Sequence, residues 1–248
     1  MDGFFANFIK ILELLSPEVL LILGFFTCIA FILIAFRYFG AFGLVCYSVL
    51  AVTIANIQVL KLGVFSYTQE PIALGTVVFT TLFTTSDLIT EHYGADLARK
   101  TVYLTFLMQI FVMLSMVFVI AHPESGGQTS AVHHGLEALF TPSLRLLIAS
   151  LIAFIISQHI DIGIFVALKK RHGKNLLWLR TNASTLISGI FDTVIFSILA
   201  WIILAPHPLP FTTVLIGFIG FSQILRAGIS IFSTPLLYIS YRLKPYDL

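Results

Sequence analysis

Residues 18–36 read EVLLILGFFTCIAFILIAF, and Glu18 is the only charged residue among them. A helix of about 20 apolar residues is long enough to cross the roughly 30 Å hydrocarbon core of a bilayer. We therefore predict an all-α membrane protein, a bundle of about seven transmembrane helices. The further spans are expected near residues 41–60, 72–91, 101–121, 144–168, 182–204 and 211–240.

The composition of the whole chain supports this interpretation. Of 248 residues, 58% are hydrophobic and 10% are charged, and the mean hydropathy is +1.00. Soluble domains carry about 25% charged residues. The net charge of +2 is too small for a nucleic-acid surface, so we expect no direct nucleic-acid partner. Cys28 and Cys46 lie in apolar stretches without ligand-like spacing and predict neither a disulfide nor a zinc site.

The charges outside the apolar stretches predict the orientation. If the first helix runs inward, ten of the 14 basic residues lie on the cytoplasmic side, and only Lys10 and Lys61 lie outside. We expect an outer N-terminus and a cytoplasmic C-terminus in a bacterial inner membrane. The segment from Phe4 to Leu15 suits an interfacial amphipathic helix, with a disordered tail as the alternative.

Three histidines lie in the loop expected at residues 122–142, which suggests metal binding by His122, His133 and His134. A solvated loop with a short helix near residues 132–139 is the simpler interpretation, because the segment is polar and rich in glycine. We expect neither a metal nor a cofactor.

Polar side chains inside the expected spans mark the candidate functional residues. A charge there costs about 2.5–3.5 kcal/mol on insertion scales, so it requires a partner, a cavity or a function. Asp87 and Glu91 share one helix face, as do Gln158 and Asp161. Other polar groups at helical spacing are Thr53 and Asn56, then Asn182, Thr185, Gly189 and Asp192, and finally Gln223, Arg226 and Ser230.

Structural roles are the alternative for these groups. Single hydroxyls commonly bond one helix to another, and Glu91 could form a salt bridge to Arg99 or Lys100. Arg145 could extend to the outer surface. Several carboxylates at membrane depth instead suit a polar solute or a proton pathway. The carboxylates that we interpret in this way are Asp87, Asp161 and Asp192.

Motifs of common catalytic sites are absent from the sequence: it contains no G-x-S-x-G, H-E-x-x-H or G-x-x-x-x-G-K-[ST] pattern. An intramembrane aspartic protease needs two carboxylates that share a proton, as Asp87 and Asp192 could do. Neither aspartate lies in the Y-D or G-x-G-D setting of such enzymes. We expect a transporter and no enzyme.

Two longer blocks carry a family resemblance. The first contains ANIQVLKL at residues 55–62 and SDLITEHYGADLARK at residues 86–100. The second contains RLLIASLIAFIISQHIDIGIF at residues 145–165 and LWLRTNASTLISGIFDT at residues 177–193. In order and spacing these blocks resemble the queuosine precursor transporters, also called the vitamin-uptake-transporter-like family, over about residues 44–240.

The resemblance implies a six-helix transporter core at residues 41–240. The chain then adds an N-terminal helix at 18–36, an interfacial or disordered segment at 1–17 and a cytoplasmic tail at 241–248. It implies import of a 7-deazaguanine base (7-cyano-7-deazaguanine, its aminomethyl form or queuine) for tRNA modification, with the lipid bilayer as surroundings and homo-oligomerisation left open. The expected substrate-binding residues are Asn56, Asp87, Glu91, Gln158, Asp161, Asn182, Thr185, Asp192, Gln223 and Arg226.

Two residues depart from the family pattern. Gly189 stands where the family often has glutamine, and Arg226 stands where lysine is expected. Tyr93 or Trp178 could stack on the base, although aromatic side chains more often serve a core or an interface. The alternative functions are a substrate-binding membrane subunit energised by a separate ATPase, and a structural protein.

Overall fold

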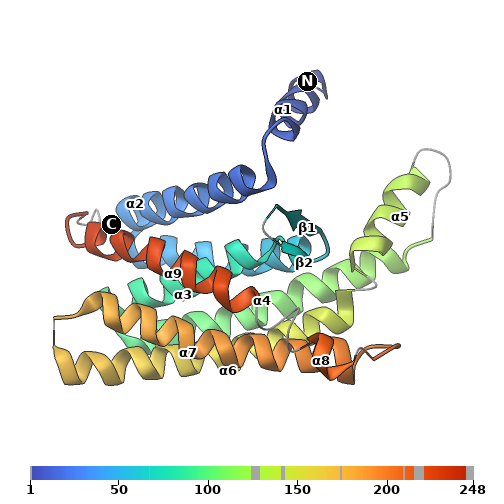
Figure 1. Ribbon diagram of the computed structural model, residues 1–248. Helices are drawn as coiled ribbons and strands as arrows, with labels where there is room; N and C mark the ends of the chain where they lie inside the picture. The colour runs from blue at the N-terminus through green and yellow to red at the C-terminus, as the bar shows by residue number, and fades with distance from the viewer. Residues whose placement is uncertain are drawn as a thin grey trace.

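The computed structural model describes residues 2–66, 68–123, 129–140, 143–173, 175–208, 210–214 and 221–243. Its long helices run side by side in a bundle (Figure 1). The helices are α1 (Asp2–Glu13), α2 (Pro17–Gln58), α3 (Thr76–His92), α4 (Ala95–Ala121), α5 (Thr129–Phe140), α6 (Ser143–His172), α7 (Leu177–Ile198), the π-helical η1 (Leu199–Ile203), α8 (Phe211–Thr213) and α9 (Phe221–Ser240).

Within the described part of the chain, four helices are long and apolar enough to cross a membrane. They are α2, α4, the part of α6 from Leu146 to His172, and α7 continued through η1 to Ile203. In α4 only 11% of the most apolar window is buried inside the bundle, as expected for a helix that faces lipid. The prediction of an all-α multi-pass membrane protein is confirmed, whereas these four helices do not confirm the expected count of seven.

The long helix α2 consists of two segments joined at Gly40. Gly40 has φ 54° and ψ −131°, a conformation that favours glycine. Three residues later, a Cβ on Gly43 would lie 2.3 Å from the carbonyl oxygen of Ala35, so only glycine allows the chain to turn so tightly. The amide and hydroxyl of Ser66 both donate to Glu18 Oε1 at 2.7 Å, which shows that the second segment returns to the start of the first.

A two-stranded antiparallel hairpin, β1 (Leu62–Phe65) and β2 (Thr68–Ala73), separates α2 from α3. The expectation of helix from residue 72 is wrong there, because the backbone pairs across the hairpin, with Leu62 opposite Ala73. Gly75 then allows α3 to begin against α2, since a Cβ would lie 2.5 Å from the carbonyl oxygen of Ala55.

Helix α3 is the central element of the bundle. Every residue from Thr80 to Thr90 is buried, and α3 packs against α2, α4, α6, α7 and α9. Its threonine-rich sequence therefore faces other helices, in keeping with the poor fit of such a sequence to lipid.

Two short helices, α1 and α5, project from this bundle, and α5 still contacts α4 and α6 (Figure 1). The residues of the expected N-terminal segment form α1, which carries exposed phenylalanines. The short helix expected near residues 132–139 is confirmed as α5. There His133 Nε2 and His134 Nδ1 approach the Glu137 carboxylate at 3.5 and 3.2 Å. Within the described ranges, no three His, Cys, Asp or Glu side chains are grouped to hold a metal.

Candidate functional site

A buried ion pair joins α7 to α9. Arg226 Nη2 lies 2.5 Å from Asp192 Oδ2, and both side chains are buried. Ser157 on α6 donates to Asp192 Oδ1 at 3.1 Å. The Arg226 guanidinium lies 5.5 Å from the ring centroids of Phe79 and Phe83 on α3, within cation–π range. Four helices thus meet at this pair.

Gln223 and Gly189 border the same ion pair. Gln223 Nε2 donates to the Gly189 carbonyl and to Thr193 Oγ1, both at 2.7 Å. A Cβ on Gly189 would lie 3.3 Å from Arg226 Cδ and 3.5 Å from Gln223 Oε1. The two residues that we expect to depart from the family pattern, Gly189 and Arg226, therefore lie side by side.

Two further carboxylates are buried in the bundle, and neither pairs with a cation among the described residues. Asp87 is 1% exposed and Asp161 is 0% exposed. Ser188 donates to Asp161 Oδ1 at 3.0 Å. Within the described residues, the other Asp161 oxygen and both Asp87 oxygens have no hydrogen-bond partner. Each carboxylate lies within electrostatic range of the other, and the hydroxyl of Ser184 faces both.

Glu91 belongs to an ion-pair cluster at one end of the bundle. Arg180 Nη2 and Lys169 Nζ lie 2.9 and 3.0 Å from its two carboxylate oxygens, and the Tyr241 hydroxyl donates to it. Burial, together with this hydrogen bond, raises the pKa of Tyr241 to about 12. The salt bridge expected for Glu91 exists, but the expected partners Arg99 and Lys100 are wrong. Arg99 instead pairs with Asp96 on its own helix at 3.3 Å.

Asn56 and Asn182 each form hydrogen bonds to a neighbouring helix. Asn56 Nδ2 donates to Gln109 Oε1 on α4 at 3.5 Å. Asn182 Nδ2 donates to Thr234 Oγ1 at 2.8 Å, and its Oδ1 accepts from Ser230 at 2.9 Å. In this conformation both amides bridge neighbouring helices.

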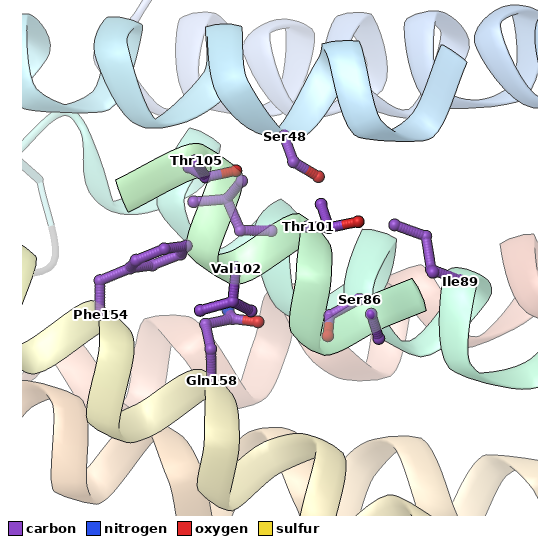
Figure 2. A pocket seen from close by; sticks show the side chains of 10 residues that line it. Ser48, Ser86, Ile89, Thr101, Val102, Thr105, Phe154 and Gln158 are labelled. Carbon is purple, nitrogen blue, oxygen red and sulfur yellow. The ribbon is translucent and has the colours of Figure 1, made fainter. Parts of the chain in front are cut away.

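A narrow pocket between α2, α3, α4 and α6 contains further polar groups (Figure 2). Gln158 lines it, together with Ser86 and Thr105. Within the described residues, Gln158 Nε2, Ser86 Oγ and Thr105 Oγ1 have no hydrogen-bond partner. The free space is about 10 Å³, room for about one water molecule. A base-sized solute could enter only if the helices separate.

Three polar residues of this pocket, Ser86, Thr101 and Thr105, are not among the residues predicted from the sequence. Ser86 directly precedes Asp87, and Thr101 and Thr105 lie one turn apart on α4, a spacing that could have revealed them. Thr185 Oγ1 is buried and lacks a partner among the described groups. Tyr93 and Trp178, considered for stacking, are 36% and 50% exposed, whereas the three aspartates are buried. The side chain of Arg145 is outside the described part of the chain.

The sequence is similar to that of several transporters. Residues 73–240 match the family described as "Putative vitamin uptake transporter". A "Probable queuosine precursor transporter" of Bacillus subtilis (strain 168) is 32% identical over 230 residues, 90% of this chain and 95% of that protein. The "Queuosine precursor transporter" of Escherichia coli (strain K12) is 25% identical over 174 residues, 66% of this chain and 70% of that protein.

A "Probable queuosine precursor transporter" of Haemophilus influenzae (strain ATCC 51907 / DSM 11121 / KW20 / Rd) is 24% identical over 158 residues, 64% of each protein. No solved structure matches this chain. The family match spans most of the chain, and the Bacillus relative is aligned over nearly all of it. The chain therefore belongs to the vitamin uptake transporter family.

Proposed function

We propose that this protein imports queuosine precursors, the free 7-deazaguanine bases that supply tRNA modification, and that it has no enzymatic activity. The names of three relatives support this substrate class. The observation that carries the proposal is a set of buried donors and acceptors around Asp87, Asp161 and Arg226 that have no hydrogen-bond partner among the described residues. Buried polar groups are normally paired, so an unpaired set within a bundle suits a polar solute.

The chemistry of the base fits these groups. A guanine-like edge presents N1–H and an exocyclic amine side by side, and one carboxylate can accept both. Asp87 and Asp161 have free oxygens for this edge. The remaining expected contacts, Gln158, Thr185 and Asp192, border the same interior, while Asn56, Glu91 and Asn182 would contribute after their present bonds break.

The group at the 7-position distinguishes the precursors. Arg226 Nε and Nη1 have no hydrogen-bond partner among the described residues. A cyano nitrogen accepts hydrogen bonds, whereas an aminomethyl group is a cation that a guanidinium repels. Arg226, with Gln223 beside it, therefore favours 7-cyano-7-deazaguanine over the aminomethyl form.

The topology belongs to the same proposal: seven spans in the inner membrane, with the N-terminus outside and the C-terminus in the cytoplasm. The two segments of α2, together with α3 and α9, would complete the count. The His92 ring centroid lies 5.0 Å from that of Phe36 and 5.2 Å from that of Tyr241. The turn at Gly40, the α3–α4 turn and the end of α9 therefore lie at one end of the bundle. The Arg180–Glu91 pair adds the α6–α7 turn. Most basic residues lie near these turns, which supports a cytoplasmic location.

Uptake in a suitable host tests the proposal. The host lacks its own carrier and deazaguanine synthesis, and it receives radiolabelled 7-cyano-7-deazaguanine, the aminomethyl form, queuine or guanine. We expect the cyano base to accumulate and queuosine to return to tRNA. If no deazaguanine restores queuosine while a vitamin accumulates, the vitamin carrier replaces this proposal. Uptake by liposomes that contain only this protein would exclude a required ATPase partner.

A further inference from the structure

In the described part of the chain, the bundle interior contains more acidic than basic side chains. Among the described residues, four carboxylates lie there, and only three cations pair with them. Arg226 pairs with Asp192, and both Arg180 and Lys169 pair with Glu91. The two carboxylates that receive no cation are Asp87 and Asp161.

These two carboxylates also lie on helices that pack against each other, Asp87 on α3 and Asp161 on α6. Each lies within electrostatic range of the other, and both are almost completely buried. Two ionised carboxylates in a low-dielectric interior repel each other and lose their hydration, so one of them takes up a proton. The unmatched charge therefore calls for a positive species at this pair, and a proton is the smallest.

The surrounding hydroxyls are suited to either protonation state. Thr181 Oγ1 and Thr185 Oγ1 are 1% exposed each and have no partner within the described residues. Ser188 donates to Asp161. A hydroxyl can donate to a carboxylate or accept from a carboxylic acid. Ser86, next to Asp87 in the chain, lines the pocket that has room for a water molecule.

We propose that Asp87 and Asp161 form a proton-binding pair that holds one proton between them in this conformation, and that this proton enters the cell with the base. The inference rests on the proposed function. One member of the pair stays ionised and accepts the donor edge of the base, while the other carries the proton from the outside and releases it to cytoplasmic water. A doubly ionised pair would not close around the base.

Other titratable groups differ from this pair in having partners or in lying farther from it. The buried polar side chains of α4, which packs against both helices of the pair, are uncharged. The titratable and charged groups that are buried or half-buried on the described elements around the pair are Glu18, Cys28, Arg37, Cys46 and Tyr47 on α2, Glu91 and His92 on α3, His159, Lys169 and His172 on α6, Arg180 and Asp192 on α7, and Arg226 on α9.

Proteoliposomes that contain the full chain test the coupling, with labelled 7-cyano-7-deazaguanine and the membrane potential held at zero. One proton per base predicts up to about tenfold accumulation for each pH unit of inward proton gradient, because a pH unit is a tenfold ratio. A protonophore should abolish this accumulation. Exchange of labelled for unlabelled base at equal pH reports transport without any gradient.

Two variants test the coupling. Asp87→Asn and Asp161→Asn keep the side-chain size and remove one titrating group each. Because both carboxylates also belong to the proposed binding site, exchange should slow in each variant, and the exchange that remains should be accompanied by an accumulation ratio of about one under the pH gradient. Asp96→Asn is the control, since that carboxylate is exposed on the surface, where it pairs with Arg99 at 3.3 Å. Calorimetric binding to wild-type protein in buffers of different ionisation enthalpy counts protons directly. It should show about one proton taken up per base at alkaline pH.

Three results would overturn the inference. Exchange by wild-type protein without accumulation under any pH gradient would reject the proton pair and leave the transport proposal intact. Accumulation that follows a sodium gradient instead would replace the proton with sodium. Absence of both exchange and accumulation for every deazaguanine would reject the proposed function, and the coupling with it.

Discussion

Gly189 and Arg226 occupy adjoining space: a Cβ on Gly189 would lie 3.3 Å from Arg226 Cδ, closer than most side chains tolerate. The missing side chain at position 189 leaves room for the wide guanidinium, which reaches Asp192 across the α7–α9 interface. The arginine therefore depends on the glycine for its position.

Gly189→Ala should reduce uptake of 7-cyano-7-deazaguanine several-fold, and Gly189→Leu should nearly abolish it, because overpacking costs about 1–3 kcal/mol and displaces Arg226. Gly163→Ala is the matched control, since its Cβ would have nothing within 4 Å. Initial uptake rates at equal protein level measure the effect. Equal rates for all three variants would contradict the dependence.

Arg226→Met should destabilise the protein by about 3–5 kcal/mol, because it leaves the Asp192 carboxylate buried without its cation. Adding Asp192→Asn should recover most of the stability and none of the uptake. Thermal unfolding in detergent and uptake assays measure the two effects. Arg226→Lys should keep the protein folded and lower its preference for the cyano base over the aminomethyl base. A double variant with full uptake would contradict a role in solute binding.

Arg180→Met should lower stability more than Lys169→Ala. Arg180 is fully buried against Glu91, whereas the Lys169 side chain is 34% exposed. Removing the partner of a buried charge costs about 3–5 kcal/mol, and removing a partner near the surface costs about 1 kcal/mol or less. Thermal unfolding of the purified variants compares them. A larger loss for the lysine variant would show that Arg180 is not the main partner.

Gln158→Leu should weaken binding of the base by about tenfold or more, since Nε2 is a buried donor that still lacks a partner and that a solute can use. Gln58→Leu is the control, because this glutamine lies at the end of α2, outside the pocket. Equilibrium binding of labelled base measures both. Unchanged affinity in the Gln158 variant would place the base elsewhere in the bundle.

A reporter that works only in the cytoplasm should be active when it is fused after Leu248, and one that works only in the periplasm should be inactive there. The reason is that the turns with most basic residues lie at the same end of the bundle as Tyr241. A fusion before residue 2 should show the opposite behaviour. Paired cytoplasmic and periplasmic reporters provide the measurement. Periplasmic activity at the C-terminus would reverse the topology.

Local patterns were sufficient to predict most of the helices. The expected spans at 101–121 and 144–168 lie within α4 and α6, and the span at 182–204 coincides with most of α7 and η1. The glycines that join the two segments of α2 are visible in the sequence, but their close approach to Ala35 is not. Apolar length and charge predict a span because each residue responds to lipid almost independently of its distant neighbours.

Pairing between helices depended on the tertiary structure. Glu91 pairs with Lys169 and Arg180, which lie 78 and 89 positions away, instead of Arg99 or Lys100. Helical spacing placed Asp87, Asp161 and Asp192 on interior faces. Only the packing of the helices decides that Asp192 pairs with Arg226, while the other two have no cation partner among the described residues. The sequence alone could identify these charges as unusual, because their cost in a membrane is a property of each residue. Which charge meets which partner depends on how four helices rotate and pack against one another, and no local spacing specifies that.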